Sequence, residues 1–260
     1  MNGDDIKIEI QHLTMAYGPH VVMRDINARV KRGCVFIVMG GSGSGKSTLL
    51  RHMVGLLCPA QGDILYDGRS FWGMDEEGRQ AQLRKFGVLF QSGALWSSMT
   101  LAENVALPLA EYTDWPAPDR QDVVRLKLAL VGLSGFEDYY PSEISGGMRT
   151  RAGLARAMAL DPEILFLDEP SAGLDPIISR NLDRLILELR DSLGATIVVV
   201  THELASIFTI ADDSIFLDAD SRTMRAQGNP KELLEHSTDA KLRAFLTRGE
   251  FSAVQYEQES

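Results

Sequence analysis

The chain has few of the features that mark a membrane span, a disulfide framework or a metal cluster. It has 260 residues and only 2 cysteines, too few for a framework of disulfides or a cluster of thiolate ligands. Cys34 borders an apolar run and Cys58 follows a predicted helix, so we expect both to be buried thiols in a reducing compartment. No apolar run reaches the length of about 18 to 20 residues that crosses a bilayer. Internal repeats and low-complexity segments are also lacking.

Positive charge is scarce as well. The chain carries 26 Lys and Arg residues against 36 Asp and Glu residues, a formal net charge of −10. Nucleic acids and anionic lipids attract clustered Lys and Arg, so a general binder of either is disfavoured. The segment Met1 to Asp5 is acidic and lacks the basic and apolar regions of a signal peptide. We therefore expect a soluble cytoplasmic protein without a nucleic-acid partner.

What the sequence does contain is a loop that fits the phosphate-binding pattern G-x-x-x-x-G-K-[ST]. An apolar run, Cys34 to Met39, precedes it and predicts a buried parallel strand. The segment Thr48 to Leu57 follows it and predicts a helix, with Pro59 as its stop. Strand, loop and helix in this order are the context in which the pattern binds phosphate. The candidate binding residues are Gly40, Gly41, Ser42, Gly43, Ser44, Gly45, Lys46, Ser47 and Thr48.

The residue types of this loop suit a nucleoside triphosphate. Glycines let the backbone curl so that successive N–H groups point inward, and the helix N-terminus adds partial positive charge. Lys46 can then reach the outer phosphates, and the Ser47 hydroxyl can hold Mg2+. The alternative is a flexible Gly/Ser loop between two elements, which the complete pattern disfavours.

Polar residues also follow three later apolar runs, at the point where each predicted strand ends. Asp168 and Glu169 end one of them, and in parallel sheets ligands lie outside the carboxyl ends of strands. Asp168 could therefore meet Mg2+, and Glu169 could take a proton from an attacking water. Gln91 and His202 end the other two runs. Gln91 has a weaker claim to contact Mg2+ or water, and His202 has a weaker claim to contact the γ-phosphate. A structural role for the histidine stays open.

A second glycine-rich turn, Ser145, Gly146 and Gly147, precedes the predicted helix Thr150 to Leu160. A helix N-terminus is a potential anion site, so the chain has two phosphate-type turns but one set of strand-end acids. The economical explanation is that the second turn serves a nucleotide bound by another copy. An ordinary helix cap with flexible glycines is the alternative.

The remaining patterns predict an α/β protein interrupted by helices. Strand-like runs vanish between Ser92 and Asp161, where the predicted helices Leu101 to Glu111 and Val123 to Val131 flank a loop at Asp114 to Pro118. Two short helices are predicted after Pro230, which either reach a second copy or cover the chain's own sheet edge. The expected divisions are a core over residues 1–91 and 162–229, a helical subdomain over 92–161 and a helical tail over 230–260.

Taken in order, these motifs resemble the ATP-binding-cassette (ABC) ATPases from Ile6 to about Leu246. Tyr17 resembles the aromatic residue that stacks on adenine, and the loop resembles the Walker A motif. The other resemblances are Gln91 to the Q-loop glutamine, Ser145 to Arg149 to the signature motif, Ile164 to Asp168 to Walker B, Glu169 to the catalytic base, Ser171 to Asp175 to the D-loop and His202 to the switch histidine. Met148 departs from the glutamine of most members, which indicates a subgroup.

The resemblance implies a P-loop NTPase (RecA-like) core with an antiparallel β N-terminal part and an inserted α-helical subdomain. It implies a homodimer in which each ATP lies between the Walker A loop of one copy and the signature turn of the other. Glu169 would polarise the attacking water, and Lys46 and Mg2+ would stabilise the phosphates, while His202 would position the γ-phosphate. The metal contacts would be Ser47, Gln91 and Asp168.

The segments Phe90 to Trp96 and Thr100 to Leu109 further resemble the ATPases of Mla-type lipid transporters, which work with MCE-domain proteins. This implies phospholipid transport through separate integral membrane subunits, with the chain at the cytoplasmic face of the inner membrane. An importer or exporter ATPase for another substrate is one alternative, and a non-transport ABC ATPase acting on DNA or ribosomes is another. Leu95 and Trp96 either form an apolar groove for a partner helix or fill the core of the helical subdomain.

Overall fold

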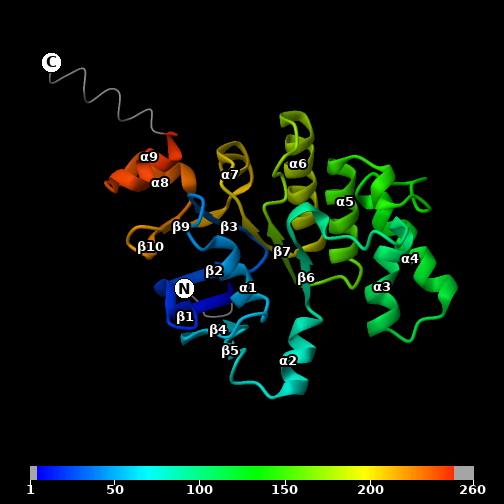
Figure 1. Cartoon of the computed structure of the whole chain (residues 1–260), viewed down its shortest axis with the longest axis horizontal. Helices are drawn as coiled ribbons and strands as arrows, with labels where there is room; N and C mark the ends of the chain where they lie inside the picture. The colour runs from blue at the N-terminus through cyan, green and yellow to red at the C-terminus, as the bar shows by residue number, and fades with distance from the viewer. Residues whose placement is uncertain (1–4, 249–260) are drawn as a thin grey trace. The chain divides into compact units, whose positions relative to one another are not determined.

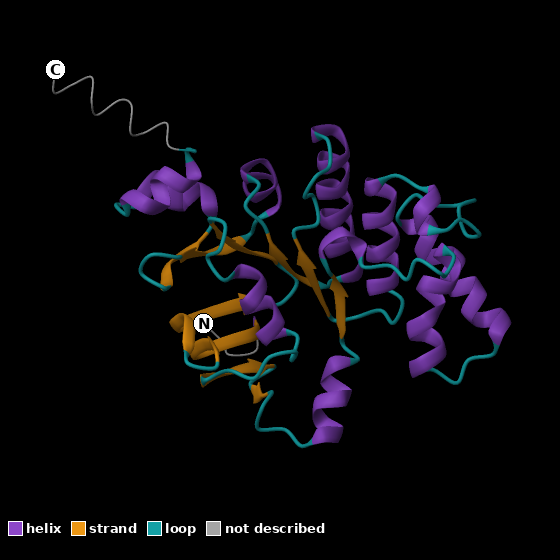
Figure 2. Ribbon diagram, viewed as in Figure 1, coloured by secondary structure: helices purple, strands orange, loops and turns teal. Residues whose placement is uncertain are grey.

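A computed structural model describes residues 5–248 of the chain. The backbone divides into two compact units, one formed by the residues up to Gly73 and from Val200 onward, the other by Met74 to Val199. Both units combine strands and helices, as Figures 1 and 2 show. This confirms the predicted α/β class, with an antiparallel sheet in the N-terminal part and parallel strand pairs in both units. The expected division into core, helical subdomain and tail remains a prediction.

The first unit contains a four-stranded antiparallel sheet with the strand order β2-β1-β4-β5. Alternating apolar side chains of β1 point into the core, and Leu13 and Met15 are as fully buried as Ile8. The strand therefore runs well past the predicted alternation at Ile6 to Ile10, through several register shifts against β2. The bounds are β1 Ile6–Tyr17, β2 His20–Lys31, β4 Gln61–Tyr66 and β5 Arg69–Ser70.

The same unit contains three strands around the predicted phosphate loop: β3 (Val35–Gly40), β9 (Asp213–Asp218) and β10 (Thr223–Gly228). Strand β3 is buried along its whole length and pairs in parallel with β9, while β10 pairs antiparallel with β9. The sequence did not predict β10, because its polar and half-buried residues lack an apolar pattern. The helices of the unit are α1 Lys46–Met53, α7 Leu204–Ile210, α8 Pro230–His236 and α9 Ala240–Leu246.

The prediction that the first helix reaches Leu57 was wrong. Helix α1 ends at Met53, and Gly55 adopts a left-handed φ of 74°. The Arg51 carbonyl accepts hydrogen bonds from the amides of both Leu56 and Leu57, which closes the helix end. Cys58, in the following turn, is exposed, so the prediction of two buried thiols holds only for Cys34. Burial raises the pKa of the Cys34 thiol to about 12.

The two C-terminal helices, which lie side by side in Figure 1, pack on their own unit. The ring of Phe245 in α9 lies 5.2 Å from that of Phe216 in β9, measured between centroids. Asp218 at the end of β9 accepts hydrogen bonds from Lys241 of α9 and from Arg225 of β10. The described part of the tail thus covers its own sheet. The expected reach toward a second copy, so far as it concerns residues after 248, lies outside the described residues.

The second unit is built on β6 (Phe86–Leu89), β7 (Ile164–Asp168) and β8 (Thr196–Val200), with β7 between the other two. Strands β6 and β7 are parallel, and Leu89 is level with Leu167. All five residues of β7 are buried, as its apolar run predicted. The helices are α2 Glu76–Leu83, α3 Leu101–Tyr112, α4 Ala117–Leu130, α5 Gly146–Ala157 and α6 Pro176–Leu193, with single 3-10 turns η2 Gln91–Gly93 and η3 Pro141–Glu143.

Between Ser92 and Asp161 the described structure has helices and no strand, as predicted, but two helices begin early. Helix α4 begins at Ala117, inside the predicted loop, because Pro118 suits the first helical turn, where no N–H partner is needed. Helix α5 begins at Gly146, so the glycines form its first turn and do not precede it.

The ion cluster around Asp218 generates a pH-dependent prediction. Burial alone raises the pKa of Asp218, but hydrogen bonds from Ser221 and Lys241 outweigh this and hold the pKa well below the usual range. A carboxylate whose pKa is lowered by folding stabilises the fold above its unfolded pKa, and this contribution is lost as the pH falls. At pH 7 we expect Asp218→Asn to lower the free energy of unfolding by about 1–3 kcal/mol. The difference from the wild type should shrink below about pH 4 in chemical denaturation. A difference that stays constant or grows on acidification would contradict this account.

Candidate functional site

The phosphate-type loop leaves the buried end of β3 in a shape that its glycines make possible. Gly40 has a φ of 156°, and a Cβ there would lie 2.5 Å from both the Leu217 carbonyl oxygen and the Ser44 Oγ. Gly43 and Gly45 have φ values of 74° and 82°, in the left-handed region that glycine adopts without strain. The backbone can therefore curl directly onto the first turn of α1.

Lys46 and Ser44 make the loop suitable for an anion. The Lys46 Nζ donates to the carbonyl oxygens of Gly40 and Gly41, each at 3.0 Å, and the side chain is almost completely buried. The buried Ser44 Oγ has no hydrogen-bond partner within the described part of the chain. The first turn of α1 has no acidic side chain, which leaves the positive end of the helix uncompensated. A positive charge over the loop and an unused hydroxyl within it fit a nucleotide phosphate.

Tyr17 lies beside this loop. Its hydroxyl bonds with Thr48 and accepts a hydrogen bond from Arg51 at 3.4 Å, both on α1. The Thr48 hydrogen bond is the main cause that lowers the pKa of Tyr17. The ring is 44% exposed. Its position and exposed ring suit stacking on a nucleobase.

His202 lies at the same edge of the first unit. The backbone amide of Thr201 donates to the Val38 carbonyl of β3 at 3.2 Å, which places His202 beside the strand that leads into the loop. The imidazole is 53% exposed, and its Nε2 lies 3.8 Å from a Glu203 carboxylate oxygen. Tyr17, the loop and His202 are thus brought together within one unit.

The second unit brings Gln91, Asp168 and Glu169 to one edge of its parallel strands. Gln91 begins the 3-10 turn just beyond β6, and Asp168 is the last residue of the adjacent β7. Asp168 is only 8% exposed. Glu169 has a φ of 48°, a left-handed conformation that costs a residue with a Cβ about 1–2 kcal/mol. Backbone strain of this kind often accompanies a side chain that is aimed for function.

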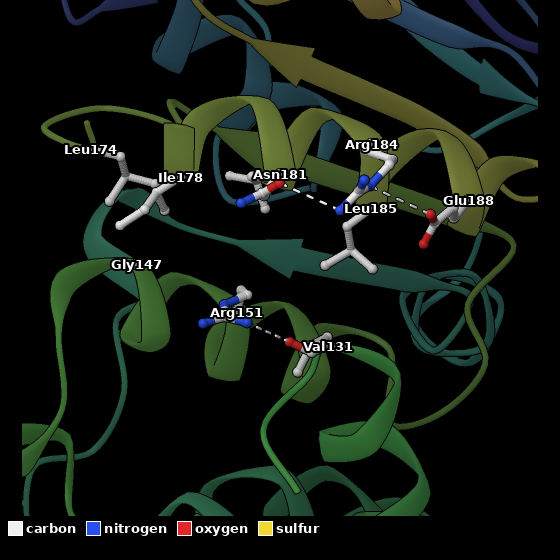
Figure 3. Close-up of a pocket in the computed structure, with 10 residues that line it drawn as sticks. Val131, Gly147, Arg151, Leu174, Ile178, Asn181, Arg184, Leu185 and Glu188 are labelled. Atoms are coloured by element: carbon white, nitrogen blue, oxygen red, sulfur yellow. Dashed lines mark hydrogen bonds and ion pairs between the residues drawn. The ribbon is translucent and has the colours of Figure 1, made fainter. Parts of the chain in front are cut away.

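The signature-type turn starts α5 in the same unit. Ser145 is the N-cap and accepts a hydrogen bond from the Met148 amide at 3.3 Å. A Cβ on Gly147 would lie 2.7 Å from the Ile178 Cγ2 of α6, so glycine permits this close approach. A pocket of about 300 Å³ extends from Gly147 between α5 and α6, with Arg151 and Leu185 facing one another across it in Figure 3.

A larger cleft of about 520 Å³ opens elsewhere on the second unit. Trp96 is 58% exposed at this cleft, which rules out the interpretation that its ring fills the subdomain core. Leu107, Pro108 and Tyr112 of α3 line another part of it. For Trp96 the structure therefore supports the groove alternative, whereas Leu95 is half-buried and is not among the residues that line the cleft. Arg156 also lines the cleft, and the sequence analysis assigned it no role.

Comparisons with known proteins show which family the chain is similar to. Residues 23–172 match the family model described as ABC transporter. The chain is 40% identical over 239 residues to the intermembrane phospholipid transport system ATP-binding protein MlaF of Escherichia coli, covering 92% of this chain and 88% of that protein.

It is also 41% identical over 241 residues to the "Probable ribonucleotide transport ATP-binding protein mkl" of Mycobacterium tuberculosis, covering 93% of this chain. The chain spans 66% of the length of that relative. Among solved structures, it is similar to the dimeric post-hydrolysis state of the ATP-binding cassette MJ0796 bound to ADP and Pi. The TM-score is 0.77, with 28% identity and coverage of 85% of this chain and 98% of that one.

The contacts of Lys46 generate a binding prediction. We expect Lys46→Ala to weaken ATP binding about tenfold or more, because a charge-assisted hydrogen bond contributes roughly 1.5–3 kcal/mol. Isothermal titration calorimetry of ATP with the full chain measures the change. Lys85→Ala is the matched control, since Lys85 is half exposed and forms a surface ion pair with Glu163. Equal affinity in the Lys46 variant and the control would refute the assigned role.

Proposed function

We propose a phospholipid-transport function for this chain, which belongs to the ABC transporter family and is an ATP-binding ATPase subunit of such a transporter. The observation that supports phospholipid as the cargo is the similarity to MlaF, which extends over nearly the whole of both chains. By this proposal the chain hydrolyses ATP at the cytoplasmic face of the inner membrane and drives lipid movement through separate membrane subunits. An MCE-domain protein is the proposed lipid-binding partner.

Two copies are proposed to share each nucleotide. The loop at Lys46 and the turn at Ser145 are both phosphate-type sites, and MJ0796, a similar cassette, is dimeric. Tyr17 would stack on the base, and Lys46 would bind the outer phosphates. Ser145, Gly146 and Gly147 of the second copy would close over the nucleotide.

Hydrolysis is proposed to proceed by in-line attack of water on the γ-phosphorus. Glu169 accepts a proton from that water as its oxygen bonds to phosphorus, and the bond from phosphorus to the β–γ bridging oxygen breaks, releasing ADP and phosphate. His202 donates a hydrogen bond to the γ-phosphate. Ser47, Gln91 and Asp168 have the oxygen ligands that suit Mg2+, which when bound would neutralise charge on the phosphates.

The cleft on the second unit is the proposed docking site for the membrane subunits. A short amphipathic helix fits such a groove, with its apolar face against Trp96 and Leu107. Among the described residues, no helix has the length and hydropathy needed to cross a membrane.

Mutation of the proposed base tests the chemistry. We expect Glu169→Gln to lower ATP turnover about 10²-fold or more, because the amide cannot accept the proton. ATP should still bind and hold a dimer, which size-exclusion chromatography with ATP measures. Glu163→Gln, just before the other end of β7, is the control and should keep wild-type turnover. Near wild-type turnover in the Glu169 variant would remove it from the mechanism.

The cargo is tested by purifying the full chain with its native membrane partners and identifying the lipids and proteins that accompany it. We expect an MCE-domain protein and bound phospholipid. Trp96→Ala should reduce the recovered membrane subunits several-fold by removing an apolar anchor, whereas Trp115→Ala, which is exposed outside the cleft, should not. Recovery of a solute-binding protein would overturn the lipid proposal. Stimulation of ATPase activity by ribonucleotides other than ATP, and not by phospholipid, would overturn it as well.

A further inference from the structure

The turn that begins at Gln91 has an unusual backbone. The Gly93 amide donates to the Phe90 carbonyl at 3.0 Å and closes the 3-10 turn. Gly93 then adopts a φ of 81° and Ala94 a φ of 45°, so two successive residues are left-handed. Glycine adopts this conformation freely, but alanine does not. Something outside the turn must therefore hold it.

Arg156 on α5 is the side chain that does so. Its Nη2 donates to the Gly93 carbonyl and its Nη1 to the Ala94 carbonyl, both at 2.9 Å. One planar guanidinium thus bridges the two left-handed residues, which a single ammonium could not do with the same geometry. Burial lowers the pKa of Arg156, consistent with a guanidinium enclosed by protein.

The turn is also pressed closely onto α5. A Cβ on Gly153 would lie 2.9 Å from the Cα and the carbonyl oxygen of Gly93, and a Cβ on Gly93 would lie 2.7 Å from the Arg149 carbonyl oxygen. Because the backbones of the turn and of α5 lie so close, the Arg156 side chain can reach the carbonyls of both Gly93 and Ala94. The turn and α5 are therefore matched to one another.

Asn104 fixes the far end of the same segment. This fully buried side chain accepts a hydrogen bond from the Trp96 amide and donates to the Trp96, Met99 and Thr100 carbonyls. Trp96, which lines the cleft, is one of the residues that Asn104 holds through their backbone. The segment from Gly93 to Thr100 is thus tied down at both ends.

We propose that Arg156 is a positioning residue that holds the Gly93–Ala94 backbone left-handed and so sets the direction of Gln91. Arg156 is also one of the residues that line the cleft. The inference rests on the proposed function in assigning Gln91 a role at the Mg2+ site.

Arg151 provides a matched control on the same helix. It donates to one backbone carbonyl, that of Val131, at 3.1 Å, and it lines the separate pocket of Figure 3. Arg151→Gln removes a comparable arginine–carbonyl hydrogen bond without touching the Gln91 turn. An effect of general loosening of α5 would appear in both variants, and an effect of positioning only in the Arg156 variant.

The first measurement is residue-level amide hydrogen exchange of Gly93 in the full chain, without nucleotide. We expect Arg156→Gln to speed this exchange about tenfold, the change that corresponds to the loss of one charge-assisted hydrogen bond. Arg156→Lys keeps the charge but loses the two-pronged guanidinium, so its exchange rate at Gly93 should lie between those of Arg156→Gln and the wild type. The exchange rate of Arg151→Gln should match that of the wild type. Equal exchange in all four proteins, or equal acceleration in both glutamine variants, would overturn the proposal.

The second measurement is the Mg2+ concentration that half-saturates ATPase activity. We expect Arg156→Gln to raise it several-fold and Arg151→Gln to leave it unchanged. Faster exchange without this increase would refute the link from Arg156 to Gln91. If the wild type itself hydrolyses no ATP, the proposed function fails, while the exchange measurement still decides whether Arg156 holds the turn.

Discussion

The structure depends on how backbone polar groups are satisfied where the chain leaves a buried strand. Strand β3 is wholly buried, so its exit must curl at once into the first turn of α1. Lys46 takes up the carbonyls of Gly40 and Gly41 that this curl turns out of the sheet. The same requirement that completes the backbone's hydrogen bonds places an ammonium over a loop with a buried, unused Ser44 hydroxyl. The need to satisfy these backbone carbonyls therefore determines both the shape of the loop and its suitability for an anion.

The second unit follows the same logic at the ends of its own strands. Asp168 ends β7 and Glu169 follows it, while Gln91 follows β6, so parallel pairing brings three polar side chains to one edge. Where the backbone is strained, as at Ala94, a neighbouring side chain holds it in place. Glycines are found where two backbones approach, as at Gly93 and Gly153. These close approaches pack α5 against the turn that carries Gln91.

Much of this could be predicted from the sequence, because the predictable parts depend on local patterns. Strand β7 is a continuous apolar run, and the loop before α1 has a fixed spacing of glycines and lysine. The parts that sequence could not supply depend on distant partners. Strand β10 has no apolar pattern and forms by pairing with β9, and the exposure of Trp96 depends on Asn104 fixing the backbone around it. The role of Arg156 could not be predicted for the same reason, since its two acceptors lie about sixty residues away in the chain.

The central proposal is that a nucleotide is shared between the loop of one copy and the signature turn of another. It is tested most directly by mixing two inactive variants, one carrying Lys46→Ala and the other Ser145→Arg, and measuring ATPase activity. If the site is shared, each mixed dimer has one site in which both changes meet and one site that is intact, so activity returns on mixing. If the loop and the turn of one chain served the same nucleotide, every site would carry a defect. A mixture that exchanges subunits yet stays as inactive as its components would therefore contradict the account.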